Sequence, residues 1–176
     1  MELKDHIRSI PDFPMAGIVF RDITTLVKDP AALQAAVAAL VEPVAGEQID
    51  QVVAAEARGF IFGGAIACRL GAGFVPVRKP GKLPAETVER TYELEYGTDT
   101  LAVHRDAIGT GDRVLVLDDL LATGGTAKAI CELVEQLGGE VVACLFLIEL
   151  SYLGGREKLG NRRVISLIDY PSEDAQ

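Results

Sequence analysis

Apolar residues along the chain follow two different spacings, and each spacing predicts one kind of element. Short runs rich in valine, leucine and isoleucine are typical of buried strands. Such runs occur at residues 52–55, 74–77, 113–117, 140–148 and 164–168. Between them, apolar positions recur every three or four residues, as on one face of a helix. This helical spacing occurs at residues 33–44, 60–70 and 129–137. Because strands alternate with helices, we expect an α/β fold with a mostly parallel twisted sheet that is flanked by helices.

Proline and glycine positions indicate where some of these elements begin and end. Pro30 stands where the first turn of a helix would begin, and Gly71 is placed to stop a helix before the next strand. Pro76 lies inside a predicted strand, and because proline cannot donate to the strand ladder, it favours a strand end or a sheet edge. A short amphipathic helix is expected at residues 3–10.

Two alternating runs outside the main pattern predict a ribbon. Residues 91–94 and 100–104 alternate apolar and polar side chains, and Gly97 opens the short turn between them. This arrangement is typical of a hairpin. The surrounding residues 78–95 are rich in charge, glycine and proline and are the least core-like part of the chain. We therefore expect the ribbon to project from the sheet.

The composition is typical of one folded domain. The chain has 176 residues, of which 49% are apolar and 24% are charged, so we expect a single domain over residues 1–176 with a sizeable core. The longest apolar runs are far shorter than a membrane span. Acidic residues and prolines interrupt the N-terminal segment, unlike a signal peptide. Three cysteines without C-x-x-C spacing are typical of reduced thiols. Together these features predict a cytoplasmic protein.

The charge of the chain is unevenly distributed. A formal net charge of −9 argues against nucleic acid or an anionic membrane as a partner. Residues 56–90 depart from this average, since basic side chains outnumber acidic ones there. A local excess of positive charge suggests an anion site, although a solvated basic surface would give the same pattern.

Residues 114–126, VLVLDDLLATGGT, are the strongest candidate for chemistry. An apolar strand runs into Asp118 and Asp119, and a turn rich in glycine and threonine then opens a helix. Ligands of open parallel sheets bind at the carboxyl ends of strands, so the acids would border a crevice, where they are natural acceptors for ribose hydroxyls. Backbone N–H groups at the positive end of a helix dipole suit a phosphate. The turn residues are Ala122, Thr123, Gly124, Gly125 and Thr126.

An ordinary strand-to-helix turn with a threonine N-cap would share part of this pattern. The complete string, however, closely resembles the loop that binds 5-phosphoribosyl 1-pyrophosphate (PRPP) in the type I phosphoribosyltransferases. It is not a Walker loop, because no G-x-x-x-x-G-K-[ST] occurs in the chain. The resemblance implies the type I phosphoribosyltransferase fold, with PRPP as a substrate.

Further segments agree with this resemblance. Residues 56–60 (EARGF) place an arginine at a helix start, residues 78–84 (RKPGKLP) form a basic turn, and residues 92–97 (YELEYG) carry two glutamates on one face of a strand. Taken alone, each also fits an ordinary helix start, solvated loop or exposed ribbon. Together with residues 13–23, they resemble the adenine phosphoribosyltransferases in order and spacing over nearly the whole chain.

This resemblance implies substrate-binding roles for particular residues. Residues 1–29 would form the purine pocket, with the base stacked on Phe20 and its edge read by backbone groups near Val19 and Arg21. Arg58 and Lys82 would hold the diphosphate. The acid pair would bind the ribose hydroxyls, and the glycine turn would bind the 5′-phosphate. The implied substrate-binding residues are Val19, Phe20, Arg21, Arg58, Lys82, Asp118, Asp119, Ala122, Thr123, Gly124, Gly125 and Thr126.

The resemblance also implies the catalytic residues, cofactor and partners. Arg58 would stabilise the departing pyrophosphate, and Glu95 would hold or exchange a proton at adenine N7. Glu95 would lie in a flexible lid loop over residues 82–105, which closes over the substrates. Mg²⁺ is implied as the cofactor, expected mainly on pyrophosphate and ribose oxygens rather than on protein ligands. The implied substrates are adenine and PRPP, and a homodimer is the implied assembly.

Two other functions remain open at this point. A phosphoribosyltransferase for xanthine, guanine or a pyrimidine would share the PRPP loop but would need different contacts to its base. A PRPP-binding regulator would instead need a basic face or an added helix-turn-helix for nucleic acid. The acidic chain disfavours the regulator, and the N-terminal segment favours adenine.

Overall fold

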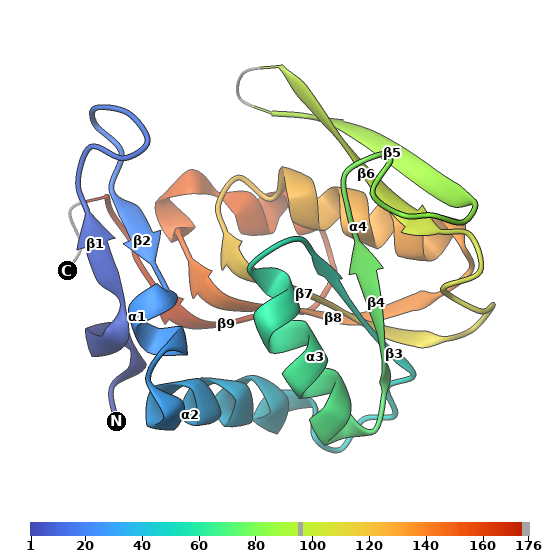
Figure 1. Ribbon diagram of the computed structural model, residues 1–176, viewed down its shortest axis with the longest axis horizontal. Coiled ribbons are helices and arrows are strands. Elements are labelled where there is room, and N and C mark those ends of the chain that lie inside the picture. Colours follow the sequence, from blue (N-terminus) through green and yellow to red (C-terminus); the bar gives the residue numbers. More distant parts are fainter. Residues whose placement is uncertain (95–96, 174–176) are drawn as a thin grey trace.

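The computed structural model describes residues 1–94 and 97–173 of the chain. Its centre is a five-stranded sheet in the order β4-β3-β7-β8-β9 (Figure 1). All neighbouring strands in this sheet are parallel, which confirms the expected sheet. The strands are β3 (Gln51–Ala55), β4 (Gly73–Val77), β7 (Arg113–Leu121), β8 (Glu140–Glu149) and β9 (Val164–Asp169).

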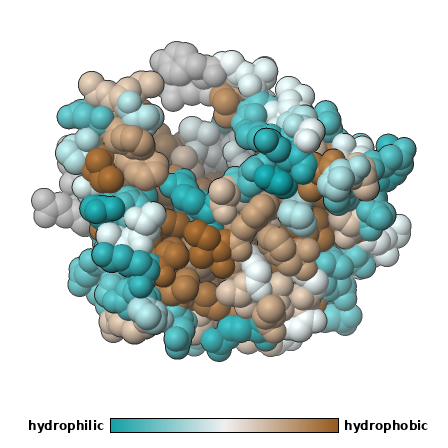
Figure 2. All heavy atoms as spheres, in the orientation of Figure 1, coloured by the Kyte–Doolittle hydropathy of each residue, from teal (hydrophilic) through white to brown (hydrophobic). Residues whose placement is uncertain are grey.

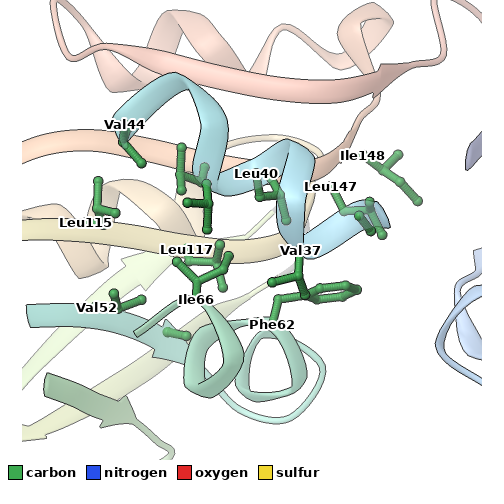
Figure 3. Packing of buried hydrophobic residues seen from close by; sticks show 14 of the residues in the cluster. Val37, Leu40, Val44, Val52, Phe62, Ile66, Leu115, Leu117, Leu147 and Ile148 are labelled. Atoms are coloured by element: carbon green, nitrogen blue, oxygen red, sulfur yellow. The ribbon is translucent and has the colours of Figure 1, made fainter. Parts of the chain in front are cut away.

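Helices cover both faces of the sheet, as the alternation of elements predicts. Leu115 and Leu117 of β7 pack against α2 and α3 on one face (Figure 3). The alternate residues Val114 and Val116 pack against α4 on the other face. Because successive side chains of a strand point to opposite faces, one apolar strand contributes to both halves of the core. The α-helices are α1 (Thr24–Val27), α2 (Pro30–Val41), α3 (Gly59–Leu70) and α4 (Gly125–Gln136).

Proline and glycine mark the element boundaries as expected. Pro30 is the first residue of α2, and the Asp29 side chain caps this helix by accepting hydrogen bonds from the first-turn N–H groups. Gly71 ends α3 with a left-handed φ of 67°. Pro76 lies in β4, which is an edge strand of the sheet, where its missing donor leaves no ladder hydrogen bond broken.

The N-terminal segment differs from the helix expected at residues 3–10. Only Leu3–His6 forms a helical turn, of the 3₁₀ type, and Arg8–Ile10 forms strand β1. This strand pairs antiparallel with β2 (Phe20–Asp22). So short a helix has little stability of its own, and pairing with a segment farther along the chain replaces it.

The predicted ribbon is present and is longer than the sequence pattern indicated. β5 (Thr87–Glu93) and β6 (Thr98–His104) form an antiparallel two-stranded sheet. It lies beside α4 and extends away from the main sheet (Figure 1). An isolated bridge between Arg78 and Ala102 joins its base to the residue after β4.

Short 3₁₀ helices complete the fold. One of them, Glu42–Val44, follows α2, and two more, Ser151–Leu153 and Gly155–Leu159, connect β8 to β9. In the part of the chain that the structure describes, no helix has both the length and the apolar character needed to cross a bilayer.

Candidate active site

The paired acids lie inside β7 rather than after it. The sequence pattern ended this strand at Leu117, and that boundary is wrong because β8 is long enough to keep pairing with β7 as far as Leu121. On its other side β7 pairs with β3, whose last residue is Ala55. Since β3 stops there, Asp118 and Asp119 still border an opening at the carboxyl end of the sheet.

Asp119 is bound by an arginine from the neighbouring strand-to-helix turn. Only 4% of Asp119 is exposed, and its Oδ2 lies 3.0 Å from Nε of Arg58. The backbone N–H of Asp119 donates to Oδ1 of Asp118 at 2.9 Å. Arg58 precedes α3, which begins at Gly59. The two strand ends therefore bring one guanidinium and two carboxylates together.

The electrostatics of the acid pair favour a ligand that donates hydrogen bonds or carries positive charge. Burial raises the pKa of Asp118 well above its ordinary value, and the adjacent Asp119 carboxylate raises it further. Burial also raises the pKa of Asp119, although Arg58 opposes this shift. A carboxylate whose charged form lacks enough donors is stabilised by any donor that a ligand brings.

The turn after β7 forms a concave backbone surface. Gly124 has a φ of 80°, which glycine adopts without a steric penalty, and α4 begins directly after it. A small cavity of about 80 Å³ is lined by this turn and Asp118. Within residues 1–94 and 97–173, no backbone acceptor pairs with the N–H groups of residues 122–124, and the first N–H groups of a helix have no partner within it. These donors are free for an anion.

A second cavity of about 190 Å³ joins the predicted site residues. It brings Arg58, both acids and Thr126 together, although they come from the turn before α3, from β7 and from α4. Figure 2 shows that this face of the molecule is hollowed between the loop of residues 11–19 and the β5–β6 hairpin. The residues lining the cavity are Ala55, Glu56, Ala57, Arg58, Lys79, Tyr92, Asp99, Leu101, Asp118, Asp119 and Thr126.

Lys82 does not line this cavity. Its side chain is exposed, and its backbone N–H donates to the carbonyl of Lys79 at 3.2 Å within the basic turn. Glu56 holds this turn, because it accepts from the backbone N–H of Lys79 at 2.7 Å and from Arg78 at 3.1 Å. These two donors, that of Lys79 first, lower the pKa of Glu56. Lys82 thus lies near the cavity on a fixed basic turn.

The N-terminal segment presents an aromatic ring to the same region. The Phe20 ring contacts Phe13 edge to face, with centroids 5.1 Å apart, and the Arg58 guanidinium lies 5.2 Å from the Phe20 centroid. Arg21 is only 6% exposed, and its guanidinium binds the carbonyl of Glu173 at 2.7 Å. The Arg21 side chain is therefore occupied in the fold, and in the strand register Arg21 lies opposite Ser9 of β1, while Val19 just before β2 is half-buried.

The hairpin contributes side chains that the sequence analysis did not select. The Tyr92 hydroxyl lies 3.1 Å from Oγ1 of Thr126 and 3.3 Å from Asp99, and Lys79 forms an ion pair with Asp99. In the hairpin register Tyr92 is directly opposite Asp99, so the pair could have been found from the alternation once the turn length was known. Glu95, the predicted catalytic glutamate, lies outside the described residues.

Comparisons with known proteins agree with this geometry. Residues 23–167 match the phosphoribosyl transferase domain family. The adenine phosphoribosyltransferase of Methylococcus capsulatus is 62% identical, over 96% of this chain and 99% of that protein. The crystal structure of the Thermoanaerobacter pseudethanolicus enzyme is similar with a TM-score of 0.94 and 55% identity, over 96% and 98% of the two chains.

A more distant relative was crystallised with ligands. The Saccharomyces cerevisiae adenine phosphoribosyltransferase, in complex with an imino-altritol bisphosphate and adenine, is similar with a TM-score of 0.89 and 44% identity, over 94% of this chain and 96% of that one. The fold, the arrangement of acids, arginine and glycine turn, and these likenesses lead to one assignment: the chain belongs to the adenine phosphoribosyltransferases of the phosphoribosyltransferase family.

Proposed function

We propose that the protein transfers the phosphoribosyl group of PRPP to adenine in the cavity beside β7, giving AMP and pyrophosphate for purine salvage. One observation carries this proposal: the acid pair, of which Asp119 is buried and Asp118 is half-buried, lies between the Arg58 guanidinium and the N–H groups of the glycine turn. In PRPP, the guanidinium would face the diphosphate, the acids would face the ribose diol, and the N–H groups would face the phosphate monoester. The yeast relative that was crystallised with adenine and a bisphosphate supports the same choice of ligands.

In this proposal the turn after β7 binds the 5′-phosphate. The backbone N–H groups of residues 122–126 and the hydroxyls of Thr123 and Thr126 donate to its oxygens, at the positive end of the α4 dipole. Asp118 and Asp119 accept from the two ribose hydroxyls. Those hydroxyls supply the donors that the buried carboxylates lack, and so favour their charged forms.

The pyrophosphate group is assigned to Arg58 and Lys82. Arg58 is shared between Asp119 and the leaving group, so it remains fixed beside the acid while negative charge grows on the diphosphate. Preorganised charge of this kind is usually the largest electrostatic contribution to lowering a barrier. Lys82 lies on the turn that Glu56 anchors beside the cavity, and its long side chain is assigned to the same group.

Adenine is assigned to the N-terminal segment. Phe20 stacks against the base, and backbone groups at Val19 and Arg21 pair with the amino donor and ring-nitrogen acceptors of its edge. An oxo-purine reverses that pattern and leaves a donor or an acceptor unpaired. A site built from such hydrogen bonds can reject the wrong analogue by about 10⁴-fold.

The reaction is a displacement at C1 of the ribose. Adenine N9 forms the new bond as the bond from C1 to pyrophosphate breaks, and positive charge develops on the sugar in between. Placement of the two reactants and stabilisation of the leaving anion do most of the catalytic work. Glu95 holds or exchanges a proton at N7 while the N9 proton is lost, and the lid over residues 82–105 keeps water from C1.

Mg²⁺, a homodimer and a cytoplasmic location complete the proposal. The acid pair is the place where the chain's own charges suit a cation, since burial raises both pKa values and nearby positive charge would lower them. Bound mainly through pyrophosphate and ribose oxygens, Mg²⁺ would add positive charge beside the leaving group. The three cysteines are free thiols, which is typical of a reducing compartment.

A direct assay tests the proposed reaction. The purified protein is incubated with PRPP, Mg²⁺ and one base at a time, and both nucleotide and pyrophosphate are measured. We expect AMP and pyrophosphate in equal amounts from adenine, and roughly 10⁴-fold lower kcat/KM with guanine, hypoxanthine, xanthine or uracil. Faster turnover of another base would reassign the substrate, and absence of pyrophosphate with every base would reject the activity.

A further inference from the structure

The turn between β8 and β9 is packed directly on the glycine turn that follows β7. A methyl group placed on Gly155 would collide with the carbonyl oxygen of Ala122 and would lie 2.9 Å from the backbone nitrogen of Gly124. In the other direction, a methyl group on Gly124 would collide with the carbonyl of Gly155. The two backbones therefore touch with no room for a side chain, and the position of one fixes the shape of the other.

An ion pair holds this turn against the end of the sheet. Arg156, the residue after Gly155, donates to Glu149 through Nε at 3.0 Å and through Nη2 at 2.5 Å. Its Nη1 donates to the carbonyl of Val164 in β9 at 2.9 Å. Glu149 also accepts from the hydroxyl of Ser166 at 2.5 Å. The arginine thus joins the turn to two strands at once.

Glu149 is placed where the glycine turn begins. It is the last residue of β8, and in the strand register it lies opposite Leu121, the last residue of β7 before the turn. Glu149 is only 6% exposed, and the hydrogen bonds from Arg156 lower its pKa against the effect of burial. The carboxylate is therefore charged at neutral pH and bound to Arg156.

We propose that Arg156, Glu149 and Gly155 form a positioning unit that sets the curvature of the glycine turn and thereby its affinity for a phosphate monoester. Arg156 and Glu149 hold Gly155 in place, and the Gly155 backbone supports the turn from behind. None of the three touches the substrate. The inference rests on the proposed function, because the ligand of the turn is the 5′-phosphate assigned there.

The test measures binding of two fragments, one for each half of PRPP. Ribose 5-phosphate probes the turn, and pyrophosphate with Mg²⁺ probes the Arg58 side. Isothermal titration of Arg156→Met is expected to show ribose 5-phosphate binding weakened by about 10-fold or more, because small displacements of a binding group have large effects. Pyrophosphate binding should change by less than about twofold. Arg156→Lys, which keeps the charge but not the forked geometry, should fall between these values.

Arg8→Met is the matched control. Arg8 binds Asp22 with Nε 3.1 Å from Oδ2, and the exposed fractions of the two side chains, 57% and 9%, are close to the 49% and 8% of Arg156 and Glu149. This pair lies between β1 and β2, away from the glycine turn. We expect Arg8→Met to lower the melting temperature by a similar amount and to leave ribose 5-phosphate affinity unchanged.

Gly155→Ala gives a second route that does not depend on the ion pair. It should weaken ribose 5-phosphate binding and raise the KM for PRPP, with little change in the KM for adenine. Gly64→Ala, at a position with open space around it in α3, is its control. Unaltered ribose 5-phosphate affinity in both Arg156→Met and Gly155→Ala would overturn the inference, as would an equal loss of pyrophosphate binding. If the unmodified protein bound pyrophosphate but not ribose 5-phosphate, the proposed phosphate site itself would be wrong.

Discussion

Two arginine–aspartate pairs in this protein have opposite electrostatics. Arg8 contacts Oδ2 of Asp22 beside the purine segment through Nε at 3.1 Å and Nη2 at 2.5 Å, and Nε of Arg58 lies 3.0 Å from Oδ2 of Asp119 beside the glycine turn. Both aspartates are buried, with 7% and 4% of their surface exposed. Yet the pKa of Asp22 is lowered to about 2, whereas burial raises the pKa of Asp119.

The difference comes from the balance between burial and hydrogen bonding at each carboxylate. Hydrogen bonds from Arg8, the largest cause, and then from the backbone N–H and the hydroxyl of Thr24, both at 2.9 Å, lower the pKa of Asp22. At Asp119 burial is the largest effect and raises the pKa, whereas Arg58 and a hydrogen bond with the neighbouring Asp118 lower it. Hydrogen bonds to the charged form outweigh burial in the first case, and burial outweighs them in the second. Asp22 is therefore satisfied by the fold, whereas the site acids need donors that a ligand would bring.

Replacing both site acids is expected to have the largest effect, with opposite signs for PRPP binding and for stability. In Asp118→Asn with Asp119→Asn, kcat/KM for PRPP is expected to fall on the order of 10²–10³-fold, because the ribose contacts lose their charge. The unliganded protein should become more stable near pH 7. A carboxyl group whose pKa is higher in the folded than in the unfolded protein lowers the free energy of unfolding at any pH above its unfolded pKa. Replacing it with an amide removes that loss of stability.

Steady-state kinetics and thermal unfolding with and without PRPP check this expectation. The melting temperature without ligand should rise, and the increase caused by PRPP should disappear. A variant that loses stability but is still stabilised by PRPP would contradict the interpretation of these acids as unsatisfied in the free protein.

Glu95→Gln tests the proposed proton transfer at adenine N7. We expect kcat to fall by about 10²-fold, as for loss of a general acid or base, while stabilisation by PRPP persists. Glu93→Gln, two residues earlier in the sequence, is the control and should keep its kcat. A fall of less than about threefold in Glu95→Gln would remove this residue from the mechanism.

Most of the fold could be predicted from the sequence because its signals are local. The apolar runs predicted the five strands of the sheet, Pro30 and Gly71 marked helix boundaries that the structure places as expected, and Pro76 lies in an edge strand. The helix over residues 3–10 failed because the pairing of Arg8–Ile10 with β2 depends on residues farther along the chain. The end of β7 failed because the length of a strand is set by its neighbour β8.

Only part of the candidate site could be predicted from the sequence, because some of its contacts join residues that are far apart in the chain. Asp118, Asp119 and the glycine turn are contiguous, so their motif could be recognised. Tyr92 and Asp99 enter the cavity through the hairpin register, and Gly155 meets the glycine turn through tertiary packing. The first contact needs the length of the hairpin turn in addition to the alternation, and no spacing in the chain encodes the second.

Asp22→Asn is the converse of the acid-pair experiment. Loss of the charged acceptor should lower the free energy of unfolding by about 2 kcal/mol, or the melting temperature by about 4–8 °C, with stabilisation by PRPP retained. Because the folded-state pKa is depressed, the contribution of Asp22 is full above the unfolded pKa of about 4 and is lost as the pH falls through about 2.

Denaturation at several pH values measures this contribution. The unmodified protein and Asp22→Asn should differ most near pH 6 and converge toward pH 2. A constant difference across that range would mean that the Arg8 pair is not the source of the stability.

Asp99 lines the cavity and can be compared with Asp22 and with the acid pair. Tyr92→Phe, which removes a hydrogen bond to Asp99, has the smallest expected effect. Burial acts to raise the pKa of Asp99, but hydrogen bonds from Lys79 and Thr100 hold it below its ordinary value, so Asp99 is a satisfied acid like Asp22. Tyr92 joins it to Thr126 of the glycine turn. Removing only the hydroxyl should raise the KM for PRPP about fivefold, the equivalent of one hydrogen bond of about 1 kcal/mol.

Thr91→Val is the control for this variant, since the Thr91 hydroxyl bonds Thr100 at 2.9 Å within the same hairpin and does not line the cavity. Its KM should not change. An equal rise in both variants would show that general loosening of the hairpin weakens PRPP binding. A rise confined to Tyr92→Phe would show that Tyr92 transmits the position of the hairpin to the phosphate-binding turn, and that the site depends on its satisfied acid as well as on its unsatisfied pair.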